Sequence, residues 1–239
     1  MLQTSKIEYS DGHIALEGYC ALNSSKPGKK PVVLVVHDWS GRNDFACQKA
    51  EQLAELGYVG FAVDMYGNGQ LGKTVEEKQA LIKPLMEDRA LLRQRIVAAY
   101  ETVARLAAVN TARMAVMGFC FGGLCALDLA RSGVDIKGAV SFHGLLMPPP
   151  NLPNKKIHAK VLALHGHDDP MVLPAQVAAF QQEMTAAHVD WQVHVYGNVQ
   201  HAFTNPVAHD PTMGTVYNGL ADKRSWVSMR EFFAEIFPQ

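Results

Sequence analysis

Residues 118–123 read Gly-Phe-Cys-Phe-Gly-Gly and lie between an apolar run, Met114–Gly118, and an apolar helical pattern, Phe121–Arg131. The string matches the G-x-S-x-G nucleophile elbow, with a cysteine thiol, Cys120, in place of the serine hydroxyl. A sharp strand-to-helix turn strains the backbone, and small glycines keep it clear of neighbouring elements. The helix that follows directs its positive end at the thiol, which favours a thiolate. A buried cysteine in a glycine-rich turn is the alternative interpretation of the string taken alone.

Outward from this string, short β-branched runs alternate with longer helical patterns. This alternation is typical of an α/β protein, with a mostly parallel central sheet flanked by helices on both faces. The one proline cluster, Met147–Pro153, has strands of the same sheet type on both sides, so it is interpreted as a surface loop and not a domain linker. We therefore expect a single α/β-hydrolase domain over residues 1–239. The expected strands are His13–Tyr19 as an edge strand, Pro31–His37, Tyr58–Val63, Met114–Gly118, Lys137–Phe142, Lys160–His165 and Trp191–Tyr196. The expected helices are Phe45–Leu56, Glu76–Val109 with a break near Pro84, Phe121–Arg131, Pro174–Ala187 and Asp222–Phe237.

An acid and a histidine follow the cysteine in the chain order that α/β-hydrolases use, which is nucleophile, acid, base. Residues 166–172, Gly-His-Asp-Asp-Pro-Met-Val, place Asp169 just beyond an apolar strand, where a parallel sheet presents catalytic groups. His201 lies in a loop after the last expected strand. Taken separately, Asp169 also fits a solvated loop acid and His201 an ordinary histidine. Their joint placement favours a catalytic triad with Cys120.

The turn after the first central strand reads His-Asp-Trp-Ser-Gly over residues 37–41. In a fold of this type that turn donates one backbone N–H to the oxyanion hole, and the residue after the nucleophile donates the other. The prediction therefore names the backbone N–H groups of Trp39 and Phe121. Ordinary core packing is the alternative role for the Trp39 side chain.

With these strings in place, the chain resembles the dienelactone hydrolase family nearly end to end. The resemblance rests on residues 37–41, 118–123, 166–172 and 201–203. It implies Cys120 as nucleophile, Asp169 and not Asp168 as the orienting acid, and His201 as base. The family also places a glutamate after the first string's histidine, in contact with the resting thiol. Here Asp38 stands at that position and is the expected thiol-modulating residue.

The resemblance also implies a departure in substrate preference. Family members that hydrolyse dienelactone hold its carboxylate with arginines, one of them four residues beyond the catalytic histidine. Asn205 stands at that position here. We therefore expect hydrolysis of a small ester or lactone through a covalent acyl-enzyme, without strong preference for a carboxylate-bearing lactone. No cofactor is implied.

Two other strings point to different chemistry. Residues 67–74, Gly-Asn-Gly-Gln-Leu-Gly-Lys-Thr, fit a phosphate-binding loop letter for letter, but three residues separate them from the preceding strand. His165 and His167, with the acids that follow them, offer metal ligands that could face one side of a strand end. A nucleotide-binding protein and a metal-dependent hydrolase are thus alternatives. A non-catalytic or redox-sensing protein, with Cys120 as a modifiable thiol, is another.

Composition limits the partners. The formal net charge is −1, so we expect neither nucleic acid nor an anionic membrane as a partner. The four cysteines lack C-x-x-C spacing, and no secretory signal is visible, which predicts free thiols and a cytoplasmic protein. The expected partner is a small-molecule ester or lactone, bound by a monomer or small homo-oligomer.

Overall fold

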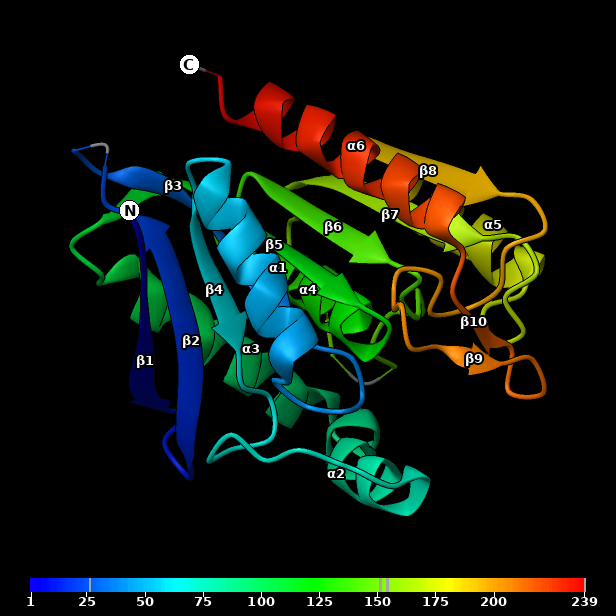
Figure 1. Ribbon diagram of the computed structural model, residues 1–239. Helices are drawn as coiled ribbons and strands as arrows, with labels where there is room; N and C mark the ends of the chain where they lie inside the picture. Colours follow the sequence, from blue (N-terminus) through cyan, green and yellow to red (C-terminus); the bar gives the residue numbers. More distant parts are fainter. Residues whose placement is uncertain (26, 151, 154, 239) are drawn as a thin grey trace.

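The computed structural model describes every residue except Lys26, Asn151, Asn154 and Gln239. An eight-stranded sheet forms its centre, in the order β1-β2-β4-β3-β5-β6-β7-β8 (Figure 1). Within the sheet, β1 and β2 are antiparallel, β2 and β4 are antiparallel, and all other neighbours are parallel. The strands are β1 Leu2–Ser10, β2 Ala15–Asn23, β3 Lys30–Val36, β4 Val59–Val63, β5 Val109–Phe119, β6 Gly138–Phe142, β7 Lys160–Gly166 and β8 Trp191–Tyr196.

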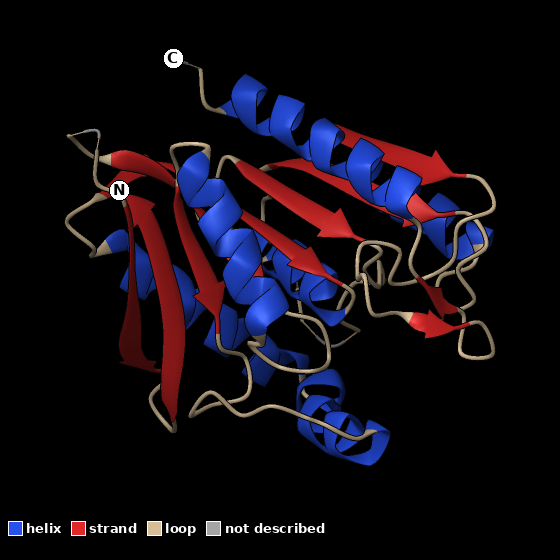
Figure 2. Ribbon diagram, viewed as in Figure 1, coloured by secondary structure: helices blue, strands red, loops and turns tan. Residues whose placement is uncertain are grey.

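Helices cover both faces of the sheet, as the alternation of patterns predicts (Figure 2). Successive residues of the central strands point to opposite faces, so β3 contributes to two separate hydrophobic cores. The helices are α1 Asp44–Glu55, α2 Val75–Glu87, α3 Arg89–Ala104, α4 Phe121–Arg131, α5 Pro174–Ala186 and α6 Gly219–Ile236. Val33 and Val35 belong to one core with residues of α1 and α6, whereas Leu34 belongs to the other core with residues of α3, α4 and α5.

The expected edge strand was misplaced. The true edge is β1, which pairs along its whole length with β2, and β2 is internal because it also pairs with β4. The expected strand His13–Tyr19 covers only the first part of β2. Most side chains of β1 are exposed, so the segment has no clear hydrophobic pattern. Its strand structure comes from backbone pairing with β2.

The long helical pattern after Glu76 contains a break, but Asp88 makes it and not Pro84. Pro84 lies inside α2, and the side chain of Asp88 accepts the backbone N–H groups of Ala90 and Leu91 to begin α3. An aspartate at this position satisfies two donors that a helix start leaves unpaired. The last residue of the expected pattern, Val109, is already the first of β5.

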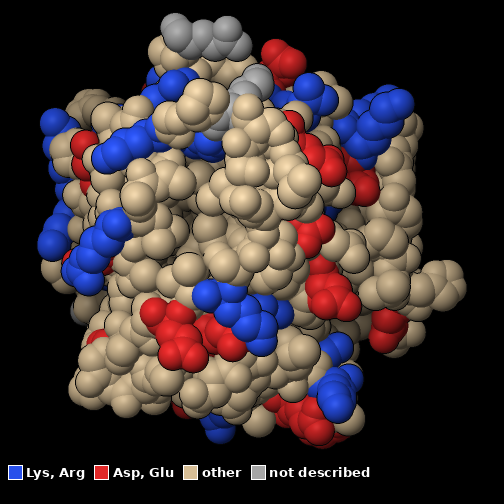
Figure 3. Space-filling view, turned by 60° about the vertical axis from the view of Figure 1, so that its left-hand side comes forward, with Lys and Arg blue, Asp and Glu red and all other residues tan. Residues whose placement is uncertain are grey.

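A small two-stranded ladder, β9 His209–Asp210 with β10 Thr215–Val216, lies beyond the main sheet. The backbone of His201 makes an isolated bridge to Thr215, so this ladder supports the loop that carries His201. On the molecular face in Figure 3, acidic and basic side chains are interspersed among wide uncharged areas. Over the described residues, no helix is both long and apolar enough to cross a membrane.

Candidate active site

Cys120 occupies a sharp turn between β5 and α4. Its φ of 55° lies in the left-handed region, which a residue with a side chain rarely adopts. The turn also brings backbones so close that side chains are excluded. A Cβ on Gly118 would overlap the carbonyl of Gly122, and a Cβ on Gly122 would overlap the carbonyl of Val36. The glycines of the string are thus required by close packing, as the nucleophile-elbow interpretation predicts.

The same turn leaves Cys120 half-buried at the N-terminus of α4. The backbone N–H groups in the first turn of a helix have no partner within the helix and carry its positive end. Phe121, the first residue of α4, contributes one of these donors beside the thiol. The arrangement therefore suits the stabilisation of negative charge at this position.

Asp169 and His201 form a buried pair. Nδ1 of His201 lies 2.7 Å from Oδ2 of Asp169, while Oδ1 of Asp169 accepts the backbone N–H of Met171 at 2.8 Å. Both side chains are almost fully buried, whereas Asp168 is exposed. The carboxylate is thus held on both oxygens, and burial identifies Asp169 as the acid that meets the histidine.

The electrostatic environment of His201 favours its protonated form. Burial opposes the imidazolium, but interactions with the neighbouring Cys120 side chain and the Asp169 carboxylate outweigh it and raise the pKa of His201 to about 10. The remaining nitrogen, Nε2, is buried without a hydrogen bond of ordinary geometry among the described residues. Catalytic hydrogen bonds are often long before substrate binds. The imidazole is thus placed between a thiol and a carboxylate.

The turn after β3 is held by several hydrogen bonds. The imidazole of buried His37 contacts the carbonyl oxygen of Asp38 through Nδ1 and accepts the backbone N–H of Met65 through Nε2. Because a trans peptide directs its C=O and N–H to opposite sides, this contact sets the direction of the Trp39 N–H. The hydroxyl of Tyr66 donates to the carbonyl of Trp39 at 2.9 Å.

The side chain of Asp38 makes a hydrogen bond within its own turn. Its Oδ1 accepts the backbone N–H of Ser40 at 2.8 Å, which caps the turn. The Trp39 side chain is half-buried, with the Lys78 ammonium 5.3 Å from its ring centroid. Core packing, the alternative role for this side chain, is therefore at most partial.

Two buried side chains at the site were missed from the sequence. His143 directly follows β6, and its Nδ1 accepts the backbone N–H of Cys120 at 3.2 Å. Its Nε2 lies 2.8 Å from Oγ1 of Thr204, three residues after His201. The rule that functional groups gather at the carboxyl ends of parallel strands applies to His143 as well as to Asp169 and would have identified it.

The phosphate-loop string has a different structure from the one its letters suggest. The backbone N–H groups of Gly67 and Gly69 donate to the carboxylate of Asp64, each at 2.9 Å. Thr74 caps α2 in a capping box with Glu77. The loop thus turns these amides onto a carboxylate of the chain itself, so they are not available to a phosphate.

The histidines of the possible metal-ligand string differ in burial. His165 is buried and His167 is exposed, so the expectation that both could face one side is wrong. The reason is that β7 ends at Gly166, so His167 already lies in the turn beyond the strand and does not share the face of His165. Among the described residues, no group of three or more histidine, cysteine or acidic side chains is arranged to hold a metal ion.

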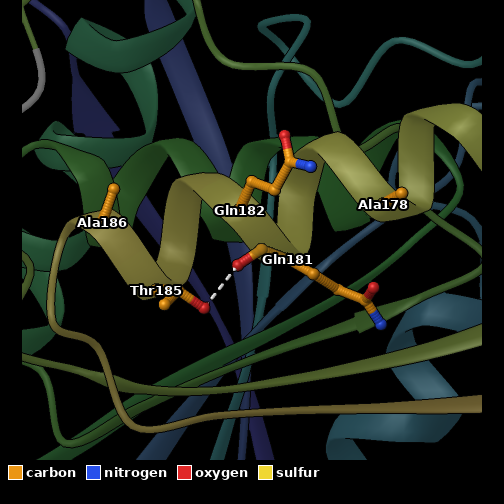
Figure 4. A pocket seen from close by; sticks show the side chains of 5 residues that line it. All are labelled: Ala178, Gln181, Gln182, Thr185 and Ala186. Atoms are coloured by element: carbon orange, nitrogen blue, oxygen red, sulfur yellow. Dashed lines mark hydrogen bonds between the residues drawn. The ribbon is translucent and has the colours of Figure 1, made fainter.

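A surface depression on α5 is shown in Figure 4. It is lined by Ala178, Gln181, Gln182, Thr185 and Ala186, and the hydroxyl of Thr185 donates to the carbonyl of Gln181. None of its lining residues belongs to the cluster of Cys120, Asp169 and His201. It carries no nucleophile or titratable side chain, so we assign the chemistry to the carboxyl edge of the sheet.

A nucleophile elbow between β5 and α4, within a mostly parallel sheet covered on both faces, defines an α/β-hydrolase. The chain belongs to the dienelactone hydrolase family, whose sequence model matches residues 16–237. It is a carboxylic ester hydrolase that acts on an ester or lactone.

Relatives of known structure and curated sequence agree with this assignment. The solved structure named m3DLH is 38% identical, with a TM-score of 0.94 and 99% of each chain covered. A dienelactone hydrolase-like promiscuous phosphotriesterase, P91 from metagenomic libraries, is 35% identical, with a TM-score of 0.94 and 98% of each chain covered. A Yersinia pestis protein named "Putative carboxymethylenebutenolidase" is 26% identical and matches 98% of this chain and 91% of its own.

Proposed function

We propose that the chain hydrolyses a small ester or lactone through a Cys120–His201–Asp169 triad and a covalent acyl-enzyme. The observation that carries the proposal is the position of His201. One ring nitrogen is hydrogen-bonded to buried Asp169. The other has no hydrogen bond of ordinary geometry within the described part of the chain, and the half-buried Cys120 is close enough to raise the pKa of His201. A base oriented by an acid and placed beside a nucleophile is the arrangement that covalent catalysis needs. In this proposal residues 1–239 act as one catalytic domain.

The reaction has two acyl-transfer steps. His201 takes the thiol proton and the Cys120 Sγ attacks the carbonyl carbon. The backbone N–H groups of Trp39 and Phe121 stabilise the oxyanion that forms. The C–O bond then breaks, and the His201 imidazolium donates its proton to the leaving alkoxide. A water molecule next attacks the thioester and His201 accepts its proton. The C–S bond then breaks, the carboxylic acid leaves, and the Cys120 sulfur takes the proton back from His201.

The substrate class follows from the leaving group and from the surroundings. A thioester forms more readily from an ester or lactone than from an amide, because the amide has the poorer leaving group. The side-chain oxygen of Asn205 accepts the backbone N–H of Val207 and so caps a turn. A neutral amide in place of an arginine favours a substrate without a carboxylate. The name of the relative P91 adds neutral phosphotriesters to the substrates worth testing.

The test compares Cys120→Ala with Cys47→Ala on a panel of chromogenic esters, lactones and one neutral phosphotriester. Cys47 is the matched control because it is a second half-buried free thiol. Burial raises the pKa of Cys47 and raises the pKa of Cys20 to about 11, which makes both poor nucleophiles. We expect no turnover by folded Cys120→Ala and near wild-type turnover by Cys47→Ala.

Trapping the intermediate completes the test. The enzyme is quenched rapidly during turnover of an ester whose acyl group is hydrolysed slowly from the enzyme. A peptide containing Cys120 should then carry the added mass of the acyl group. Turnover should survive exhaustive chelation, and Mg-ATP should leave the Tm unchanged, since a ligand of the native state raises it. Turnover by the folded Cys120→Ala protein would overturn the proposal, and a redox-sensing thiol would give alkylation without turnover.

A further inference from the structure

His143 is a buried histidine that the proposed triad does not use. It follows β6 directly, is 2% exposed and has a φ of 39°, in the left-handed region. Its own backbone N–H donates to the carbonyl of Leu164 at 2.8 Å, which fixes the start of the loop. A histidine held in a rare backbone conformation beside a nucleophile indicates a constrained function.

The contacts of the His143 ring determine its tautomer. Because a backbone N–H is only a donor, the contact from Cys120 requires Nδ1 to be unprotonated. The proton of the neutral ring is therefore on Nε2, which donates to Oγ1 of Thr204 at 2.8 Å. The Cys120 N–H is shared with the carbonyl of Phe142 at 3.0 Å, so the ring completes a bifurcated bond.

Geometry around the ring favours the neutral state. The ring centroid of His143 lies 5.2 Å from that of His201 in an edge-to-face arrangement, and Phe203 packs on it at 5.0 Å. Burial lowers the pKa of His143 well below its ordinary value, and the positive charge on His201 lowers it further. A neutral His143 avoids two like charges at this distance when His201 is protonated.

We propose, on the basis of the proposed triad, that His143 is a positioning residue that joins the Cys120 backbone to the His201 loop. The two hydrogen bonds reach in opposite directions, one to the nucleophile and one to Thr204, which follows His201 by three residues. The neutral imidazole thereby sets the separation between Sγ of Cys120 and Nε2 of His201. His143 itself never touches the acyl group.

The experiment removes the contact to the His201 loop without changing shape. Thr204→Val deletes the hydroxyl, and Thr204→Ser restores it. We expect Thr204→Val to lower kcat about tenfold with KM changed by less than about twofold, since misplacement of reacting groups slows chemistry more than binding. Thr204→Ser should recover most of the loss. Circular dichroism and the Tm check that each variant is folded.

The pH profile distinguishes positioning from packing. The pKa of His201 is raised partly by its interaction with the nearby Cys120 side chain, so moving the two apart should shift the alkaline limb of kcat/KM to lower pH in Thr204→Val. The rate of Cys120 alkylation by iodoacetamide should change its pH dependence in the same variant. A packing defect alone would lower the Tm and leave both profiles in place.

A second variant tests the chain of contacts. In His143→Asn the amide oxygen replaces Nδ1, and asparagine tolerates a left-handed φ, so of the two ring hydrogen bonds only the one to Thr204 is lost. His143→Asn with Thr204→Val should therefore be no slower than His143→Asn alone. Additive losses, or wild-type kcat and pH profiles in Thr204→Val, would overturn the positioning role. The alkylation measurement needs no turnover, so it tests the positioning role of His143 separately from the triad. Turnover by Cys120→Ala would overturn the triad, whereas an unchanged alkylation profile in Thr204→Val would overturn only the positioning role.

Discussion

Nδ1 of His201 lies 2.7 Å from Oδ2 of Asp169, although 32 residues separate the two in the chain. The pair is buried at the carboxyl edge of the sheet, where the loops after β7 and β8 meet. Each loop has its own support, because Asp169 is held by the Met171 N–H and His201 by the backbone of Thr215 and Gly214. The geometry therefore makes the acid and the histidine one unit, and the predictions below begin with it.

Replacing the buried acid should cost far more than replacing its exposed neighbour. Asp169→Asn removes the charge that orients the His201 tautomer, so we expect kcat/KM to fall about a hundredfold or more. Asp168→Asn should change kcat/KM by less than about twofold, because an exposed side chain seldom contributes. Steady-state kinetics on one chromogenic ester measures both. Equal losses in the two variants would contradict the assignment of the acid.

The elbow should not accept a side chain at Gly122. A Cβ there would overlap the carbonyl oxygens of Val36 and His37, so Gly122→Ala should lower the free energy of unfolding by about 1–3 kcal/mol. Gly197→Ala is the matched control, since nothing lies within 4 Å of its added Cβ. Chemical denaturation compares the two variants with the wild type. A free energy of unfolding for Gly122→Ala equal to that of the wild type would contradict the close packing.

His143 should make the free energy of unfolding depend on pH. Because its folded pKa lies well below the ordinary 6.5, the unfolded chain binds the proton first as the pH falls. The free energy of unfolding should then fall below pH ~6.5 by as much as about 1.4 kcal/mol per pH unit from this group. His143→Asn removes that contribution, so its profile between pH 7 and 5 should be shallower. Parallel wild-type and variant profiles would show that His143 protonates equally in both states.

Asp38 should restrain the resting thiol. A carboxylate near Cys120 disfavours the thiolate, and Asp38→Asn removes the charge while its amide oxygen can still cap Ser40. We expect iodoacetamide to alkylate Cys120 about two- to fivefold faster near neutral pH, from roughly 1 kcal/mol or less of repulsion. The difference should fade at higher pH, where the wild-type thiol is ionised. Superimposable profiles would leave Asp38 only its turn-capping contact.

Substrate charge should matter little to the wild type and more to Asn205→Arg. A charge-assisted contact contributes about 1.5–3 kcal/mol, so an arginine at this position should raise the preference for a carboxylate-bearing lactone about tenfold or more. The measurement is kcat/KM for an anionic lactone and its neutral counterpart in both proteins. A hundredfold preference for the anion by the wild type would contradict this account.

The sequence by itself determined the elements that have a strong local signal. Helix α4 and strand β8 begin and end at the predicted residues. The apolar helical pattern of the first and the alternation of the second are properties of a few neighbouring residues. The string around Cys120 also predicted the sharp, strained strand-to-helix turn, since close backbone packing requires glycine there. The family and the fold class could be inferred from such strings.

Only the tertiary structure decided which distant groups meet. Strand β1 exists because β2 pairs with it, and its exposed side chains leave no pattern to detect. His143 contacts the backbone of Cys120, 23 residues away, and Thr204, 61 residues away. The physical reason is that parallel crossovers bring the carboxyl ends of separate strands to one edge of the sheet. Hydrophobic periodicity records which face of an element is buried, whereas strand order determines which loops become neighbours.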